Sequence, residues 1–95
     1  MTGKRLGERR EVFYSGRVQG VGFRFRSASI AARYRVTGYV QNLDDGRVQL
    51  VVEGEASELE KFLADITETM QTYIRDTRLD VGPATGEFDE FAIRT

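Results

Sequence analysis

Several short stretches of the chain alternate apolar and polar residues, which is the pattern of a β-strand with one buried face. Two of them, 36–43 and 47–53, are separated by Asp44-Asp45-Gly46. Glycine adopts a positive φ at little cost, so this sequence predicts a tight hairpin turn. The strands predicted from alternation cover residues 11–15, 36–43, 47–53, 77–81 and 88–94.

Two other segments space their apolar residues three or four positions apart, which predicts helices with one buried face. The first covers residues 23–33, and the second starts at Ser57, which forms a predicted capping box with Glu60. The helical pattern continues through Tyr73-Ile74-Arg75-Asp76, so either the second helix is longer than in similar folds or the fourth strand is displaced. The residues expected on the buried faces are Phe23, Ser27, Ile30, Ala31 and Tyr34 in the first helix, and Leu59, Phe62, Leu63, Ile66, Met70, Tyr73 and Ile74 in the second.

The order of the predicted elements is β-α-β-β-α-β with an extra C-terminal strand. An α+β chain of this kind is expected to form a ferredoxin-like α/β sandwich, in which two helices pack on one face of an antiparallel sheet. Its 95 residues suffice for one domain with a single modest core. We therefore predict one domain over residues 11–95, preceded by a flexible polar tail over residues 1–10.

The amino-acid composition excludes several kinds of catalytic and metal site, because the residues that they require are missing. The chain has no cysteine and no histidine, which excludes thiolate nucleophiles, Ser-His-Asp triads and zinc sites built on thiolate or imidazole. It has no apolar run near twenty residues, and residues 1–15 lack an apolar segment, so we expect neither a membrane-spanning helix nor a signal peptide. These features predict a cytoplasmic protein without disulfides.

Charge is unevenly distributed along the chain. Residues 1–47 contain ten Lys and Arg against four Asp and Glu, whereas residues 48–95 contain four against eleven. A basic half favours an anionic partner. The alternative is that arginines on one helix pair with acidic residues on the other, and charge alone does not decide between the two.

The most informative stretch joins the first strand to the first helix and reads Gly16-Arg17-Val18-Gln19-Gly20-Val21-Gly22-Phe23-Arg24. Glycines let the backbone approach a ligand closely, and the free amides at a helix start attract an oxyanion, which Arg24 can hold in bidentate fashion. The alternative is a tight turn whose glycines serve geometry only. The stretch has neither the Lys-Ser/Thr of a Walker A loop nor the third glycine of a dinucleotide fingerprint.

Three further features each allow two interpretations. Asn42, the one asparagine of the chain, either forms the turn or donates to and accepts from one water molecule. Asp44 and Asp45 are either turn residues, which is the favoured interpretation, or ligands of a hard cation. Phe23 and Phe25 lie beside arginines, as in proteins that stack on bases, but Phe23 also fits the buried stripe of the first helix.

Taken together, these motifs resemble the acylphosphatase family. The resemblance runs from about Val12 to Ile66 without a gap, and Phe91-x-Ile93 is similar to the family's last strand. The family's fold is the ferredoxin-like sandwich that the periodicity predicts. The matching motifs are Gly16-x-Val18-Gln19-Gly20-Val21-Gly22-Phe23-Arg24, Gly38-Tyr39-Val40-Gln41-Asn42, Asp45-Gly46-x-Val48 and Glu53-Gly54.

The resemblance implies hydrolysis of the carboxyl–phosphate bond of acyl phosphates. The family's catalytic arginine and asparagine fall on Arg24 and Asn42, with Asn42 orienting the attacking water. It implies a monomer that acts on a small molecule without metal, cofactor, nucleic acid or membrane. The residues expected to cradle the phosphoryl group are Gly16, Arg17, Val18, Gln19, Gly20, Val21, Gly22 and Phe23.

Two other functions fit the same fold. A non-catalytic ferredoxin-like module would bind an anion or a protein through the basic half of the chain, but it would have no need for Asn42. An RNA-binding sheet of the same topology would require an aromatic stacking signature, which the sequence lacks.

Overall fold

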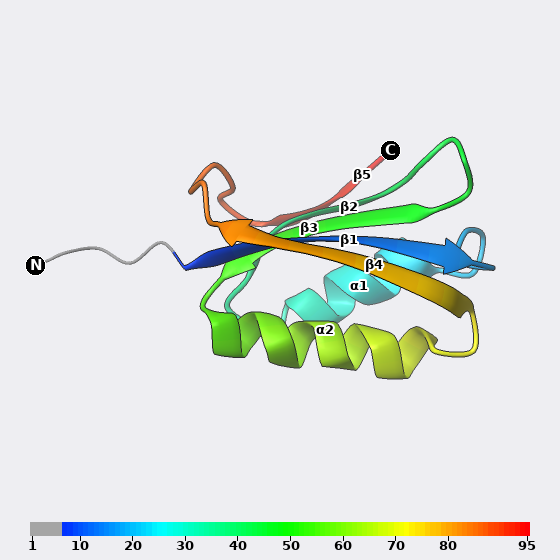
Figure 1. Cartoon of the computed structure of the whole chain (residues 1–95), viewed down its shortest axis with the longest axis horizontal. Coiled ribbons are helices and arrows are strands. Elements are labelled where there is room, and N and C mark those ends of the chain that lie inside the picture. Colours follow the sequence, from blue (N-terminus) through cyan, green and yellow to red (C-terminus); the bar gives the residue numbers. More distant parts are fainter. Residues whose placement is uncertain (1–6) are drawn as a thin grey trace, which may run out of the picture.

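Residues 7–95 are described by a computed structural model, in which one sheet lies over two helices (Figure 1). The elements follow one another in the predicted order. In this part of the chain no helix is long and apolar enough to span a membrane. The elements are β1 (Glu8–Gly16), α1 (Phe23–Ala31), β2 (Thr37–Asn42), β3 (Val48–Gly54), α2 (Ala56–Met70), β4 (Ile74–Pro83) and β5 (Phe91–Arg94).

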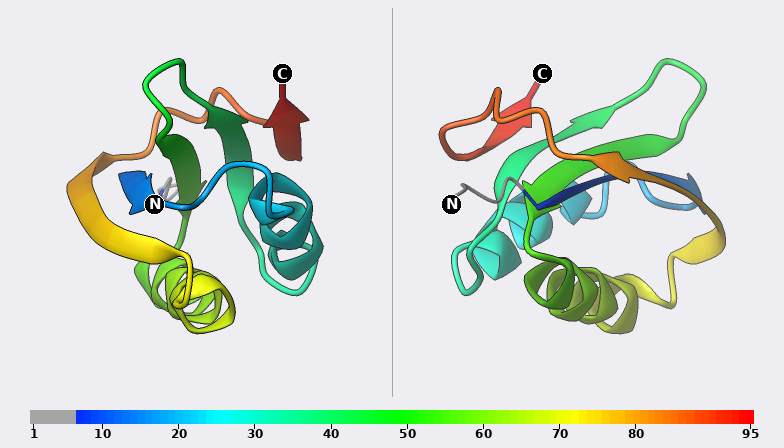
Figure 2. Two further views of the ribbon diagram at one scale, coloured as in Figure 1. Left: turned by 90° about the vertical axis from the view of Figure 1, so that its right-hand side faces the viewer. Right: turned by 60° about the vertical axis from the view of Figure 1, so that its left-hand side comes forward.

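The five strands lie in the order β4-β1-β3-β2-β5. The pairs β4–β1, β1–β3 and β3–β2 are antiparallel, and both helices cover the same face of the sheet (Figure 2). This arrangement confirms the ferredoxin-like sandwich. β5, however, runs parallel to β2, so the sheet is mixed rather than purely antiparallel. The reason is that the chain reverses once after β4 and pairs at the opposite edge of the sheet.

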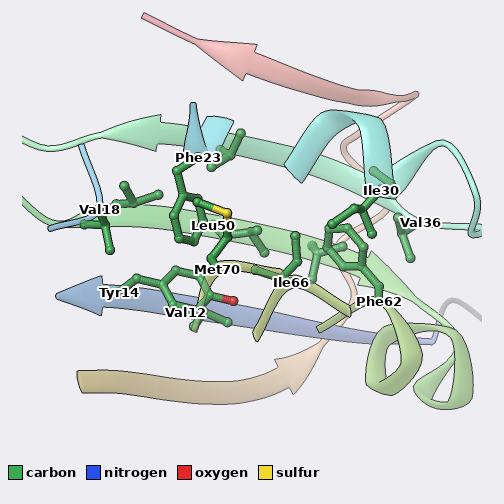
Figure 3. Packing of buried hydrophobic residues seen from close by; sticks show 14 of the residues in the cluster. Val12, Tyr14, Val18, Phe23, Ile30, Val36, Leu50, Phe62, Ile66 and Met70 are labelled. Carbon is green, nitrogen blue, oxygen red and sulfur yellow. The ribbon is translucent and has the colours of Figure 1, made fainter. Parts of the chain in front are cut away.

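The core fills the space between the sheet and the helices (Figure 3). Helical spacing predicted most of the core residues of the two helices, whereas it gave no indication of the buried loop residue Val18. Burying each large apolar side chain contributes roughly 1.5–3 kcal/mol. Tyr34, Leu63, Tyr73 and Ile74 are only partly buried at its rim. The residues of the strands and helices that are buried in the core include Val12, Tyr14, Phe23, Ser27, Ile30, Ala31, Val40, Val48, Leu50, Val52, Leu59, Phe62, Ile66 and Met70.

The first strand begins earlier than predicted, because residues 8–10 already belong to β1. Their backbones pair with β3 on one side and with β4 on the other. The pattern of alternating apolar and polar residues did not predict this part of the strand, because all three side chains are charged. The strand forms because its backbone N–H and C=O groups pair with those of the neighbouring strands. The predicted flexible tail therefore does not extend to residue 10, and its residues 1–6 lie outside the described part of the chain.

The start of α2 also differs from the prediction. Glu55 is the N-cap residue, the helix begins at Ala56, and no side chain caps its first turn. The predicted capping box is wrong because Ser57 already lies inside the helix, while the Glu60 carboxylate lies 3.7 Å from the guanidinium of Arg10.

The segment after α2 is the largest correction. The helix ends at Met70, and the amide of Tyr73 donates to the Met70 carbonyl across a turn (2.9 Å). β4 then runs from Ile74 to Pro83, rather than over residues 77–81. The helical spacing of Tyr73 and Ile74 misled the prediction, because backbone pairing of β4 along β1 decides the conformation of this segment.

Candidate active site

The loop between β1 and α1 is held at its start by the turn between α2 and β4. The amide of Arg17 donates to the carbonyl of Tyr73 at 2.9 Å. Gly16 has φ 127°, and a Cβ on it would lie 2.5 Å from the same carbonyl oxygen. Glycine is therefore required at this position both by conformation and by space. The first residues of the loop serve to anchor it.

Farther along, Gly20 and Gly22 have φ 79° and 80°, a region that other residues enter at a cost on the order of 1 kcal/mol. A Cβ on either glycine would meet nothing within 4 Å, so both face open space. Between the anchored and the open part, the fully buried Val18 fixes the loop in the core. The loop therefore combines a rigid base with an open surface of backbone.

α1 starts from this loop with Gly22 as its N-cap residue. No side chain caps the first turn, and the turn contains no acidic residue. Arg24 lies there instead, although a cation is disfavoured at the positive end of a helix dipole. An anion bound beside Arg24 removes this conflict, because it satisfies both the guanidinium and the uncapped amides.

The register of the strands places Asn42 at the end of the sheet where the β1–α1 loop lies. Val48 of β3 pairs with Tyr14 of β1 on one side and with Asn42 of β2 on the other. These three residues form one row, and their parity places them on the face that the helices cover. Figure 1 shows the β1–α1 loop and the β2–β3 hairpin at this end of the sheet. Asn42 is half-buried there.

The side chain of Gln19 joins the loop to the hairpin. Its Nε2 donates to the carbonyl of Leu43 at 2.8 Å and to the carbonyl of Arg47 at 2.9 Å. The amide of Leu43 in turn donates to the Arg47 carbonyl at 2.8 Å. Leu43 directly follows Asn42, so these bonds fix the loop relative to Asn42. The Gln19 side chain is thus engaged with the hairpin.

A hollow of about 140 Å³ opens between the loop, the start of α1 and the end of β2. It brings Arg24 and Asn42 together with four of the predicted loop residues, namely Val18, Gly20, Gly22 and Phe23. Gly16, Arg17, Gln19 and Val21 do not line it. One residue outside the predicted phosphoryl site, Phe25, does line it. The guanidinium of Arg24 donates to the carbonyl of Arg94 at 3.3 Å.

The aspartates of the hairpin behave as turn residues. Asp45 accepts from the amide of Arg47 at 3.0 Å and from its Nε at 2.9 Å. The hydrogen bond from the Arg47 amide is the main reason that the pKa of Asp45 lies below its ordinary value. Among residues 7–95, no three acidic side chains gather in a way that could hold a metal ion.

Comparison with known proteins points to one family. The acylphosphatase family model matches residues 10–93. An acylphosphatase of Methylococcus capsulatus is 44% identical over 88 residues, which cover 90% of this chain and 95% of that protein. The crystal structure of acylphosphatase from Bacillus subtilis has a TM-score of 0.83 at 27% identity and covers 93% of this chain and 99% of its own. The structure of an acylphosphatase from Coxiella burnetii has a TM-score of 0.72 at 28% identity and covers 93% of this chain and 94% of its own.

Proposed function

This chain belongs to the acylphosphatase family, and from that premise we propose that it hydrolyses the carboxyl–phosphate bond of acyl phosphates. The oxygen of water bonds to phosphorus while the bond from phosphorus to the carboxyl oxygen breaks. The products are a carboxylate, inorganic phosphate and a proton. The leaving carboxylate is stable without protonation, so the reaction needs no strong general acid, and the chain has neither cysteine nor histidine to supply one.

The phosphoryl group is proposed to bind in the hollow between the loop and α1. The observation that carries this assignment is the arginine in the first turn of a helix that no side chain caps, beside an open glycine loop. Loop and helix amides donate to the phosphoryl oxygens, and the guanidinium of Arg24 balances their charge as it grows in the transition state. Because contacts with Tyr73 and with the hairpin hold the loop before the substrate binds, its amides cost little reorganisation.

Asn42 is proposed to orient the attacking water. Its amide can accept a hydrogen bond from the water and also donate one, and it lines the same hollow as Arg24. Holding the water in line with the breaking bond converts a bimolecular encounter into a positioned attack. Asn42 and Arg24 thus act on different partners, the water and the phosphoryl group.

The decisive measurement is hydrolysis of benzoyl phosphate by the purified chain in EDTA. We expect turnover that the chelator leaves unchanged, and loss of about a thousandfold in kcat on Arg24→Ala. Arg26→Ala is the matched control, because Arg26 is an exposed arginine of the same helix that does not line the hollow. Absence of turnover would instead support a non-catalytic anion-binding module. Turnover that Arg24→Ala leaves unaffected would contradict the role proposed for Arg24.

The proposal extends to a monomer that works in the cytoplasm on a small-molecule substrate. The absence of cysteine, and therefore of disulfides, supports the cytoplasmic part of this proposal. Sedimentation of the purified chain at the concentration of the assay tests the monomeric state.

A further inference from the structure

Phe25 is the most exposed large apolar side chain among the described residues, with 76% of its surface open to solvent. It follows Arg24 in the first turn of α1. Phe23 points into the core, and two residues on a helix correspond to a rotation of about 200°, so the ring of Phe25 faces away from the core. The other exposed large apolar side chains of residues 7–95, Leu79 and Val81, lie on β4 at the edge of the sheet opposite β5.

The hollow that contains Arg24 and Asn42 offers one apolar surface to a ligand. Of its apolar lining residues, Val18 is fully buried and Phe23 is 2% exposed, so their side chains belong to the core. Its glycines have no side chains, and the remaining lining side chains of Arg24 and Asn42 are polar. Phe25 therefore supplies the exposed apolar wall of the site.

We infer that the ring of Phe25 contacts the acyl group of the substrate and makes the enzyme favour acyl phosphates with aromatic or bulky apolar acyl groups. The inference rests on the proposed function. Once the phosphoryl group lies against the loop amides and Arg24, the acyl group has to extend out of the hollow past its rim. A methyl group is too short to cover the ring, whereas a phenyl group stacks on it or meets its edge.

This contact forms before the reaction and persists through it, because the acyl group does not change its position when the phosphorus–oxygen bond breaks. An interaction of equal strength in both states lowers KM and leaves kcat unchanged. The role of Phe25 is thus one of substrate selection, separable from the roles proposed for Arg24 and Asn42.

The test compares benzoyl phosphate with acetyl phosphate in the wild-type chain and in Phe25→Ala. We expect KM for benzoyl phosphate to rise about three- to tenfold, with kcat unchanged and with acetyl phosphate unaffected. Phe25→Leu should keep part of the preference because it retains an apolar side chain. Leu79→Ala, which removes an exposed apolar side chain on β4, is the control and should change neither substrate.

A second measurement separates this inference from the proposed function, because it does not depend on turnover. Benzylphosphonate should bind the wild-type chain more tightly than methylphosphonate, and Phe25→Ala should remove the difference. If the wild-type chain hydrolyses neither substrate yet shows this pattern, the proposed reaction fails and the contact stands. If turnover is present but Phe25→Ala affects both substrates equally, or neither, the contact is wrong.

Discussion

Arg24 lies at the start of a helix, whereas Asn42 lies at the end of a strand, and the roles proposed for them can therefore be tested separately. Arg24 lies where free helix amides converge, and it competes with an unfavourable helix dipole unless an anion is present. Asn42 ends a strand and takes its position from the register of β2 with β3. In the proposed mechanism, Arg24 therefore binds the charged phosphoryl group and Asn42 positions the water.

Replacing Asn42 by alanine should remove most turnover and leave phosphate affinity nearly intact. In the proposed mechanism the amide holds the water and contributes little to binding of the phosphoryl group, so kcat should fall by about a hundredfold or more. Inhibition of the wild-type chain by inorganic phosphate, compared with direct phosphate binding to the variant, gives the two affinities. A collapse of phosphate affinity in the variant would mean that Asn42 binds the phosphoryl group itself.

At the scale of elements, the β1–α1 loop depends on two segments that are distant in sequence. The turn after α2 holds its start through the Tyr73 carbonyl, and the β2–β3 hairpin holds its middle through the side chain of Gln19. The segment that sequence reasoning misread as helix is therefore one of the supports of the candidate site.

Gln19→Ala should lower kcat about tenfold under conditions where the protein is fully folded. The variant loses both hydrogen bonds between loop and hairpin, and small displacements of positioned groups reduce rates strongly. The matched control is Gln41→Ala, which removes a hydrogen bond to Gln49 between β2 and β3. If both variants lose only thermal stability and keep kcat, then Gln19 stabilises the fold without positioning the site.

Two glycines, Gly38 on β2 and Gly46 in the β2–β3 hairpin, should differ in how much stability is lost when each is replaced by alanine. Gly38 has φ 143°, and a Cβ on it would lie 1.9 Å from the Val51 carbonyl oxygen, whereas Gly46 has φ 95° and open space. Gly38→Ala must therefore displace paired backbone and should cost about 2–4 kcal/mol. Gly46→Ala carries only conformational strain, about 1 kcal/mol. Denaturant unfolding of both variants measures the difference, and equal losses would contradict this reading of Gly38.

At the scale of the whole molecule, Glu53 connects the middle of the sheet to the loop that leads to β5. The carboxylate is 4% exposed and accepts from the amide of Thr85 at 3.0 Å, from its hydroxyl at 2.8 Å and from the amide of Gly86 at 2.9 Å. Arg9 donates to it at 3.3 Å. Burial raises the pKa of Glu53, but the hydrogen bonds together lower this pKa by more than burial raises it. The pKa of Glu53 therefore lies below its ordinary value.

A lowered pKa in the folded state means that the Glu53 carboxylate stabilises the fold at neutral pH. This contribution is lost as pH falls below the ordinary value of 4.5 and through the lower folded value. Glu53→Gln should reduce the free energy of unfolding at pH 7 by about 1–3 kcal/mol, and the difference from wild type should shrink below pH 4.5. Glu60→Gln, at an exposed carboxylate, is the control. A difference that stays constant with pH would contradict the assignment.

The sequence by itself determined the order of the elements, the buried faces and the residue types of the candidate site. Local patterns carry this information, because alternation and helical spacing follow directly from backbone geometry. The predictions failed where local and tertiary preferences differ. Residues 8–10 are charged yet pair as strand, and Ile74 fits a helical stripe yet begins β4.

Only the tertiary structure decided which residues of the motifs face the hollow and which support it. Gly16 and Gln19 belong to the same motif as Gly20 and Gly22, but their contacts are with Tyr73 and with the hairpin. Phe25 could be noticed in the sequence as an aromatic residue without a partner, but its place at the rim of the site depends on how α1 meets the end of β2. Such placements arise from contacts between distant segments, and no local pattern encodes them.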